Sequence, residues 1–438
     1  MVLLKNFKNM FFIPELRKKL FFTLGVLIIE RLGLFIPIIG VNAELLAQRM
    51  GQKGLLGGLL GYLDTFSGGA LAKGAIFALG ISPYISASIM MQMLTMAVPS
   101  LELLSKEGDY GRKIINQYTR YLTLLLSVVW STTFAITLES QGLAITPGWG
   151  FRLLAILSLT TGSMFVMWLG EQISLFGIGN GSSMIIFAGI VARFPEYFLR
   201  TLTVVFELGT LAGWQALLIL AIFIAIIACI IFLEKGERKI PVQYARRIIG
   251  QRVYGGQSSY IPFKINSAGV MPVIFATTIL QVPLAISGFL AQKAYVFKVF
   301  SEWFAPAGIL FNISEFFLII FFSFFYTALI YNPDELAENI KKNGGFIPGI
   351  RPGKKTADFF NYILTRIGLV GAVYLGCLAL APNILSALFE MPFILGGTSL
   401  LIVVGVALET SSQIESYLIE HRYEGFLTSG RMKSRIAR

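Results

Sequence analysis

Charged side chains are scarce in this sequence. They make up 14% of the 438 residues, whereas hydrophobic residues make up 55%, and the mean hydropathy is +0.73. An ordinary soluble domain carries about 25% charged residues, so this composition excludes one. The sequence therefore predicts an all-α, polytopic membrane protein.

Cysteine and histidine are rarer still. Cys229 and Cys377 both fall within apolar runs, so neither a disulfide framework nor a thiolate metal site is expected. The one histidine, His421, follows the last apolar run, and the motifs of metal-dependent proteases and of ATP-binding phosphate loops are absent. We therefore expect no catalytic residues, no metal, no cofactor and no enzyme activity, and transport must be driven by a partner or a gradient.

Ten apolar runs are long enough to cross the hydrocarbon core as helices. They lie near residues 20–39, 75–98, 118–138, 152–170, 183–200, 214–233, 268–288, 311–331, 367–386 and 397–416. An even number of spans places both termini on one side of the membrane. Most of the 36 lysine and arginine residues fall on that side, so both termini are expected in the cytoplasm. The first run lacks a small-residue cleavage site, which favours a retained span over a signal peptide.

We expect the ten spans to form two halves of five. The predicted parts are a cytoplasmic N-terminal segment, an N-terminal half, a C-terminal half and a cytoplasmic tail, at residues 1–19, 20–200, 201–416 and 417–438. A pseudo-two-fold axis in the membrane plane would relate the halves. No residue-level repeat is visible between them, so this symmetry is inferred from the number and spacing of the spans.

The stretch 66–99 departs from an ordinary span. It opens with the glycine-rich turn 67–69, and the apolar run 75–98 that follows also carries serine, proline, tyrosine and glutamine. Non-helical backbone at membrane depth is tolerated only inside protein or beside water, and polar side chains there should avoid lipid. The stretch therefore predicts a half-inserted segment leading into a helix with one polar face, as in a pore with a movable stopper. The glycine run 177–181 follows an apolar run, which favours a tight turn over a nucleotide loop.

Charged residues within the spans need partners, because each costs about 2.5–3.5 kcal/mol at the membrane centre on insertion scales. Glu30 stands beside Arg31 in span one, and Glu409 lies toward the end of span ten. Adjacent residues on a helix do not face each other, so separate partners are expected for Glu30 and Arg31. A structural ion pair and a proton or ion relay both remain open.

Two long loops, 234–266 and 332–366, are more basic than topology alone requires. They are expected to dock something acidic or large, such as anionic lipid, RNA or an acidic protein face. Glycine and proline in the second loop should form a fixed, protruding turn. The candidate binding residues are Arg246, Arg247, Arg252 and Arg351.

Short motifs spread over nearly the whole chain point to a known family. They include Phe66-Ser-Gly-Gly-Ala-Leu71, Pro83-Tyr-Ile-Ser-Ala-Ser88, Asn116-Gln-Tyr-Thr-Arg120, Trp168-Leu-Gly-Glu-Gln172, Gly177-Ile-Gly-Asn-Gly181 and Pro348-Gly-Ile-Arg-Pro-Gly353. In this order they resemble the SecY family, which forms the central channel subunit of the bacterial Sec protein translocase. The resemblance implies ten helices around a plugged pore in the cytoplasmic membrane. Such a passive channel passes unfolded secretory polypeptides and releases signal sequences and membrane segments laterally.

The resemblance implies a plug at about residues 58–73, filling the outer funnel of the resting channel. Its residues include Tyr62, Leu63, Asp64, Thr65, Phe66, Ser67, Gly68, Gly69, Ala70 and Leu71. The sequence suggests no strong anchor for this plug. The implied pore ring consists of Ile81, Ile85, Ser182, Ile186, Ile274 and Ile402. The family usually has an aliphatic residue where Ser182 stands, so either this position leaves the ring or the ring is slightly more polar.

A lateral gate between spans two and seven is also implied. Its residues would be Ser86, Met90 and Gln92 on one side, and Asn266, Ile274 and Val282 on the other. Met90, Met91 and Met93 suit either a soft surface for varied signal sequences or ordinary core packing. The implied partners are the SecE and SecG subunits, the SecA motor ATPase, the ribosome, signal-bearing precursor polypeptides and membrane lipids.

Two other classes of protein share parts of this pattern. A secondary transporter of small solutes would also have broken helices and inverted repeats. It would need paired carboxylates or a binding cluster near the middle of the membrane, and the sequence largely lacks them. An intramembrane hydrolase would need a general base, for which the sequence offers no plausible candidate. We therefore favour a protein-conducting channel.

Overall fold

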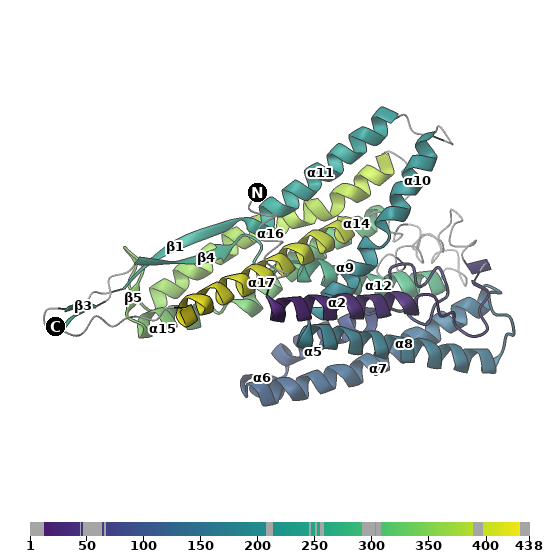
Figure 1. Ribbon diagram of the computed structural model, residues 1–438, viewed down its shortest axis with the longest axis horizontal. Coiled ribbons are helices and arrows are strands. Elements are labelled where there is room, and N and C mark those ends of the chain that lie inside the picture. The colour runs from purple at the N-terminus through teal and green to yellow at the C-terminus, as the bar shows by residue number, and fades with distance from the viewer. Residues whose placement is uncertain are drawn as a thin grey trace. The chain divides into compact units, whose positions relative to one another are not determined.

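The computed structural model divides the chain into two compact units (Figure 1). Unit 1 comprises Met1–Gln52, Leu63–Arg193 and Val406–Arg438, and unit 2 comprises Lys53–Tyr62 and Phe194–Gly405. The structure describes residues 13–43, 45–46, 64, 67–206, 213–244, 247–249, 252–254, 258–290, 303, 308–388 and 397–429. Helices dominate these ranges.

Unit 1 is built from helices in its described part. They are α2 (Pro14–Gly33), α5 (Ser82–Ala97), α6 (Pro99–Lys106), α7 (Asp109–Ser140), α8 (Trp149–Phe176), α9 (Gly181–Val191) and the final part of α17 (Gly397–Ser429). α7 packs against both α5 and α8, and α2 packs against α8 (Figure 1). These neighbours form the scaffold on which the candidate site is built.

Small hydroxyl side chains let α7 pack closely against α8. Thr119, Thr123, Ser127 and Ser131 recur at four-residue spacing and share one helix face, and all four are buried. Each hydroxyl donates a hydrogen bond to a backbone carbonyl about one turn earlier, which satisfies it at membrane depth. Ser131 Oγ also lies 3.2 Å from Thr160 Oγ1 of α8. This face of α7 therefore contacts α8 through a small side chain, Ser131.

Span two is shorter as a helix than the apolar run 75–98 suggests. α5 begins at Ser82, and turns occupy residues 76–81. Gly74 and Gly80 have φ angles of +59° and +54°, which side-chain-bearing residues rarely adopt. The non-helical backbone expected before the span is therefore present, and it extends as far as residue 81 because of these two glycines.

The glycine run between α8 and α9 forms the tight turn that the sequence predicts. Gly179 has a φ angle of +85°, and the Asn180 side chain caps α9 by accepting a hydrogen bond from the N–H of Ser182 at 3.1 Å. A Cβ at Gly181 would lie 1.8 Å from the carbonyl oxygen of Gly170. Only glycine fits at this point, so the run allows α9 to start directly against α8.

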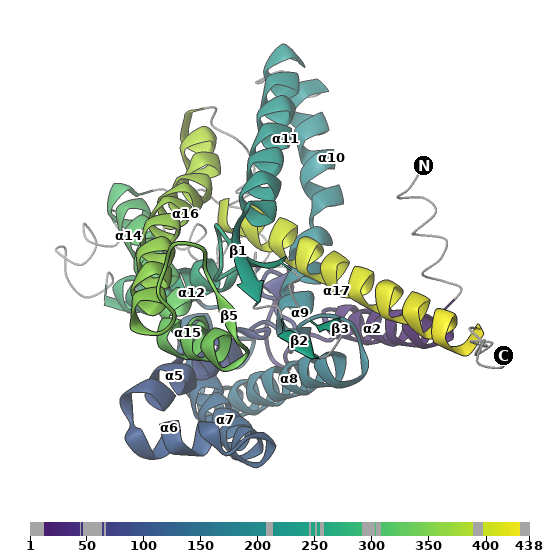
Figure 2. The ribbon, with the colours of Figure 1, turned by 90° about the vertical axis from the view of Figure 1, so that its left-hand side faces the viewer.

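Unit 2 carries the other helices that the structure describes. They are α10 (Phe194–Phe206), α11 (Gly213–Lys235), α12 (Met271–Leu290), α14 (Ile309–Ile330), α15 (Pro333–Lys342), α16 (Lys354–Leu388) and the first part of α17. α14 packs against α12 and α16, and α16 packs against α11. Figure 1 and Figure 2 both show α14 beside α16.

A buried carboxylate between α14 and α16 was missed by the sequence analysis. Glu315 is 1% exposed, and its Oε2 atom accepts a hydrogen bond from Asn383 Nδ2 at 3.5 Å. The same amide donates to Asn312 Oδ1 at 3.0 Å. The amides supply hydrogen bonds that lipid cannot offer, so this cluster links the two helices. In the described part of the chain, no group of three or more histidine, cysteine, aspartate or glutamate residues is placed to hold a metal ion.

Seven described helical segments are long and apolar enough to cross a membrane, or eight if the bent pair α5 and α6 is one span. The two helices meet at 100°, because the backbone is extended at Val98, before Pro99. The chain is therefore a multi-pass membrane protein, which confirms the class predicted from its composition. The number of ten spans stays a prediction.

The long loop 234–266 contains strands, which the all-α prediction did not include. The strands in the described part of the chain are β1 (Glu237–Tyr244), β2 (Arg247–Ile249), β3 (Arg252–Tyr254), β4 (Ser258–Lys264) and β5 (Gly345–Phe346). β1 pairs antiparallel with β4 on one side and β5 on the other, and β2 pairs with β3. Ile240 and Val242 share one face of β1 and are both buried.

An apolar cluster fastens the three-stranded sheet to α15 and α16. Its residues are Ile240, Val242, Phe263, Ala337, Ile340, Ile347, Ala357, Phe360, Ile363 and Leu364. The rings of Phe263 and Phe360 have centroids 5.5 Å apart, and each side chain is at most 1% exposed. Burying such a side chain contributes about 1.5–3 kcal/mol. The sheet, α15 and the start of α16 therefore form one packed body, here called the sheet body.

Candidate functional site

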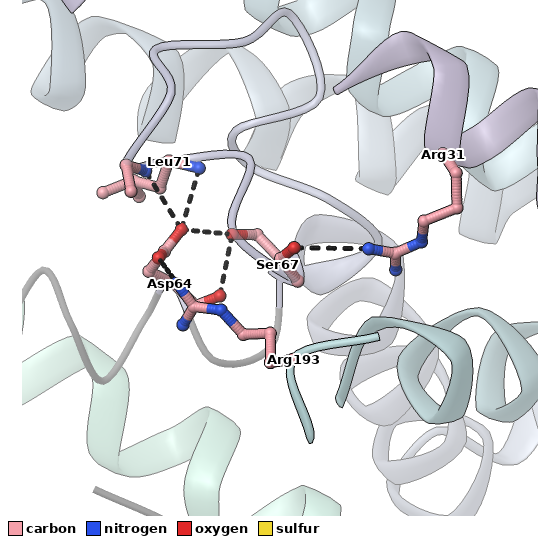
Figure 3. A network of polar contacts seen from close by, with 7 residues as sticks. Arg31, Asp64, Ser67, Leu71 and Arg193 are labelled. Atoms are coloured by element: carbon pink, nitrogen blue, oxygen red, sulfur yellow. Dashed lines mark hydrogen bonds and ion pairs between the residues drawn. The ribbon is translucent and has the colours of Figure 1, made fainter. Parts of the chain in front are cut away.

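Asp64 organises the turn-rich segment that precedes α5 (Figure 3). Its Oδ1 atom accepts hydrogen bonds from the backbone N–H groups of Leu71 at 2.9 Å and Ala72 at 3.0 Å, and from the Ser67 hydroxyl at 3.1 Å. Its carbonyl oxygen accepts a hydrogen bond from the N–H of Gly69 at 3.2 Å. One aspartate therefore fixes the shape of the described part of the predicted plug.

The second carboxylate oxygen of Asp64 binds Arg193, which follows the end of α9. Arg193 Nη2 lies 2.5 Å from Asp64 Oδ2, and the two side chains are 15% and 2% exposed. Figure 3 shows the Arg193 side chain reaching toward the Asp64 carboxylate. Each partner of a buried ion pair depends on the other to compensate its lost hydration. The sequence suggests no strong anchor for the plug, and this pair corrects that expectation.

A second arginine reaches the plug from α2. Arg31 Nη1 donates a hydrogen bond to the carbonyl oxygen of Gly68 at 3.2 Å, and Arg31 Nε lies 2.9 Å from Glu30 Oε2. The expectation of separate partners is therefore wrong for Glu30, which pairs with Arg31, whereas Arg31 has a separate partner in Gly68. The spacing rule concerns helix faces, and it fails here because the long arginine side chain folds back on its neighbour. Arg31 of α2 therefore contacts both its neighbour Glu30 and the described part of the predicted plug.

The backbones of the plug and α9 also approach each other closely. Gly68 has a φ angle of +65°, and a Cβ there would lie 2.8 Å from the Cα atom of Gly189 and 2.6 Å from Arg31 Nη1. Glycine is therefore required at Gly68 by its conformation and by space. Two arginines and one glycine-to-glycine contact therefore hold the described part of the predicted plug.

Within unit 1, the plug lies beside the elements that carry four predicted ring residues. These residues are Ile81, Ile85, Ser182 and Ile186. A Cβ at Gly80 would lie 3.6 Å from the Cα atom of Ser67. A Cβ at Gly170 of α8 would lie 3.2 Å from Ile81 Cδ1 and 3.6 Å from the backbone nitrogen of Ser182. The structure therefore brings the starts of α5 and α9 to one place on α8, next to the plug.

The predicted ring residues differ in burial. Four isoleucines are at most 5% exposed: Ile81, Ile186, Ile274 and Ile402. Ile85 and Ser182 are half-buried, and the Ser182 hydroxyl donates a hydrogen bond to Asn180 Oδ1 at 2.7 Å. Ile274 and Ile402 belong to unit 2, and the ring of six residues stays a prediction.

The predicted gate residues of α5 have different environments. Ser86 is buried, and its hydroxyl donates to a backbone carbonyl one turn earlier. Gln92 donates to the Ser88 hydroxyl at 3.3 Å. Met90 is 42% exposed, whereas Met91 is buried. Exposed Met90 fits a soft binding surface, and Met91 fits core packing.

Asn266, predicted to line the gate before α12, ties together two helices of unit 2. Its Nδ2 atom donates hydrogen bonds to Glu234 Oε1 at 2.6 Å and to the carbonyl oxygen of Gly269 at 2.9 Å. The residue is 6% exposed. Asn266 therefore fixes the start of α12 relative to the end of α11.

Arg351 stands exposed on the turn between β5 and α16. Gly349 and Gly353 have φ angles of +82° and +102°, and the Arg351 carbonyl oxygen accepts a hydrogen bond from the Thr356 hydroxyl at 2.9 Å. The other exposed basic residues of the sheet body are Arg238, Lys239, Lys264, Lys341, Lys342, Lys354 and Lys355. A hydrogen bond to the Glu237 carboxylate raises the pKa of Lys239. The exposed acidic residues of the sheet body are fewer: Glu237, Asp334, Glu335, Glu338 and Asp358. Its described surface is therefore basic on balance.

Several predicted site residues lie outside the described residues. They are Tyr62, Leu63, Thr65, Phe66 and Arg246. The structure describes only the backbone of Arg247 in β2, Arg252 in β3 and Val282 in α12. Their roles in the plug, the gate and the docking loops stay predictions.

Sequence reasoning did not connect Arg31, Gly189 or Arg193 to the plug. Both arginines interrupt predicted spans, and a charge at membrane depth marks a functional position by default. That signal was available and could have singled out Arg193. Gly189 carried no comparable signal, because its importance depends on the close approach of Gly68 from a distant part of the chain.

Known proteins resemble this chain over most of its length. A family model named SecY matches residues 75–411. The protein translocase subunit SecY of Aquifex aeolicus (strain VF5) is 45% identical over 427 residues, which cover 96% of this chain and 98% of that protein. The subunit of the same name from Escherichia coli (strain K12) is 44% identical over 425 residues, covering 96% and 95%.

Solved structures share the fold. One described as "The structure of a protein conducting channel" has a TM-score of 0.63 at 18% identity, covering 92% of this chain and 93% of its own. One of "Sec61 in the Canine ribosome-channel complex from the endoplasmic reticulum" has a TM-score of 0.57 at 16% identity, covering 92% and 93%. With a family model that matches most of its length and relatives about 45% identical, this chain belongs to the SecY family.

Proposed function

We propose that this chain is the channel-forming subunit of a bacterial protein translocase. It would let unfolded secretory polypeptides cross the cytoplasmic membrane through a passive pore. The observation that supports this proposal is the turn-rich segment 67–73, the described part of the predicted plug together with Asp64, which lies beside the starts of α5 and α9 in unit 1. The identity of about 45% to named translocase subunits supports it.

The predicted ring suits a pore that must stop ions and pass a polypeptide. A narrow aliphatic constriction excludes water, and ions do not cross a dewetted passage. Isoleucine offers no hydrogen bond that would hold a moving backbone, so an extended chain slides past it. The Ser182 hydroxyl donates a hydrogen bond to Asn180 Oδ1. Ser182 therefore adds little polarity to the predicted ring.

The plug would act as the removable seal of this pore. Its described part is fixed by Asp64 and held by Arg31 and Arg193. These contacts are polar, so water can replace them when the plug leaves its place, and the apolar side chains buried in the described plug are only Ala70 and Leu71. A plug embedded through large apolar side chains would lose far more hydrophobic stabilisation on opening.

A lateral gate would release apolar segments into lipid. A signal sequence is an apolar helix, and it gains about 0.8 kcal/mol for each CH₂ group that leaves water. Spans two and seven, α5 and α12, would part to let it out, with Ser86, Met90 and Gln92 on one side. The exposed, flexible Met90 suits contact with signal sequences of varied shape.

The basic sheet body would dock the partners that drive transport. SecA and the ribosome are the expected partners there, because exposed arginines pair well with carboxylate and phosphate. SecE and SecG would complete the channel, and both chain termini would lie in the cytoplasm, together with the sheet body. Energy would come from these partners, and the chain itself would have no enzyme activity.

A vesicle assay tests the proposal. The protein is reconstituted with SecE and SecG, then given SecA, ATP and a precursor that carries a signal sequence. We expect the precursor to become protected from added protease, and protection to require both ATP and the signal. Absence of protection with an active motor would contradict the proposal and direct attention to uptake of small solutes, the transporter alternative.

A further inference from the structure

One face of α9 connects the predicted pore ring to the plug. The residues along it are Ser182, Ile186, Gly189 and Arg193. Their spacings of four, three and four place them on one side of a helix, and Arg193 follows two residues after the helix ends. Two of them are predicted ring residues, Gly189 is approached by Gly68, and Arg193 binds Asp64. The element that lines the pore is therefore also the element that holds the plug.

The charges at this contact are balanced, and the two carboxylates among them are buried. Asp64 faces Arg193, and Glu30 accompanies Arg31. Both carboxylates have side chains at most 5% exposed. If one charge of such a pair is removed, its partner is left uncompensated, and both Asp64 and Arg193 are mostly buried, at 2% and 15% exposed. This is far more unfavourable than losing an exposed pair.

We propose that Asp64 and Arg193 form a latch that keeps the plug seated in the resting channel. The inference rests on the proposed channel function and on the plug assignment. Asp64 is a positioning residue with two tasks, since one oxygen shapes the turn 67–72 and the other ties that turn to α9. The plug leaves only if the pair separates. The strength of the pair therefore sets the fraction of resting channels that are open.

Three variants separate the latch from the turn. Asp64→Asn keeps an oxygen that accepts the hydrogen bonds of Leu71 and Ala72, and it removes only the charge that Arg193 needs. Arg193→Met removes the cation and keeps a long side chain. The double variant, Asp64→Asn with Arg193→Met, removes both charges and leaves neither one uncompensated.

The readout is the ion conductance of the purified channel with SecE and SecG in planar bilayers, without SecA, ATP or precursor. We expect each single variant to raise the resting conductance at least about tenfold, because an unpaired buried charge favours the open state. The double variant should conduct less than either single variant. A purely structural role for Asp64 predicts no such rescue, since asparagine preserves the turn.

A more exposed ion pair elsewhere in unit 1 supplies the control, with side chains 35% and 16% exposed. Arg152 Nε binds Glu139 Oε2 and joins α8 to α7, away from the plug in the chain. Glu139→Gln should leave the resting conductance unchanged. Driven translocation of a precursor by each variant shows that the channel has folded, so that a leak reports plug seating and not collapse.

A channel lacking residues 62–72 sets the unplugged level and separates two kinds of failure. If that deletion leaks while Asp64→Asn stays tight, the latch is refuted and the plug assignment stands. If the deletion also stays tight, the plug assignment and the latch both fall. If the double variant leaks at least as much as Asp64→Asn alone, the coupling between Asp64 and Arg193 is refuted.

Discussion

The plug and the sheet body are held in place by different forces. The described plug is fixed by one carboxylate, two arginines and a contact between glycine backbones. The sheet body is held by ten buried apolar side chains, with Phe263 and Phe360 among the most enclosed in the protein. The described plug combines a few directional contacts with two buried apolar side chains, Ala70 and Leu71, whereas the sheet body has a continuous core.

This difference separates a part suited to move from a part suited to stay. Polar contacts act over short distances, and water can replace them once the plug is displaced. An apolar core must be exposed to water over its whole area before it comes apart. A seal that opens repeatedly fits the first arrangement, and a surface that holds a partner in a fixed orientation fits the second.

Deleting residues 62–72 should give the largest effect. The deletion removes Asp64 and the turn it shapes, so every described contact between the plug and α9 is lost. Breaking a buried ion pair alone costs about 3–5 kcal/mol, which corresponds to a change of on the order of a hundredfold or more in the closed-to-open ratio. Resting conductance in planar bilayers measures this change in the closed-to-open ratio. An unchanged conductance would remove the functional contrast between plug and sheet body.

Phe360→Ala should loosen the sheet body and leave the plug alone. Truncating a fully buried phenylalanine costs about 3–5 kcal/mol, here within the core that joins the sheet to α16. Limited proteolysis should cut the loops of the sheet body faster, while resting conductance stays low. Tyr362→Ala is the matched control, because Tyr362 lies on the same helix and is 54% exposed. A rise in leak with Phe360→Ala would show that the two regions are not independent.

Gly68→Ala should unseat the plug by a steric route. The new Cβ would lie 2.8 Å from the Cα atom of Gly189, so the plug must shift, and we expect resting conductance to rise about tenfold for a loss of about 1.4 kcal/mol. Gly142→Ala is a close control. Gly142 has a φ angle of +68°, against +65° for Gly68, but open space surrounds it. Equal leak from both variants would mean that backbone strain, and not the contact with α9, causes the effect.

Arg351→Glu should produce the smallest of these changes, a several-fold loss of SecA-driven precursor transport. The side chain is exposed on a turn fixed by Gly349 and Gly353, so reversing its charge should disturb docking and not folding. Surface charges steer association more than they stabilise the fold. Transport and SecA binding are measured together, with Arg351→Lys as the charge-preserving control. Normal transport by the glutamate variant would exclude Arg351 from the docking surface.

Local patterns predicted much of the helical framework. The apolar run 118–138 lies inside α7, and 152–170 lies inside α8, because a helix long enough to cross the membrane leaves a continuous apolar signal. The turn at 177–181 was also predicted, since glycine marks it locally. The strands of the sheet body were missed. Only Ile240 and Val242 carry the two-residue alternation on β1, and so short a pattern is hard to separate from a basic loop.

The sequence by itself determined that this is a multi-pass membrane protein of the SecY family, because hydropathy and short motifs are properties of contiguous residues. The tertiary structure decided what holds the plug. Asp64 and Arg193 are far apart along the chain, and their pairing arises only because the turns before α5 fold back against the end of α9. The close approach of Gly68 to Gly189 is decided in the same way. No local pattern encodes such distances, since they depend on how whole helices pack.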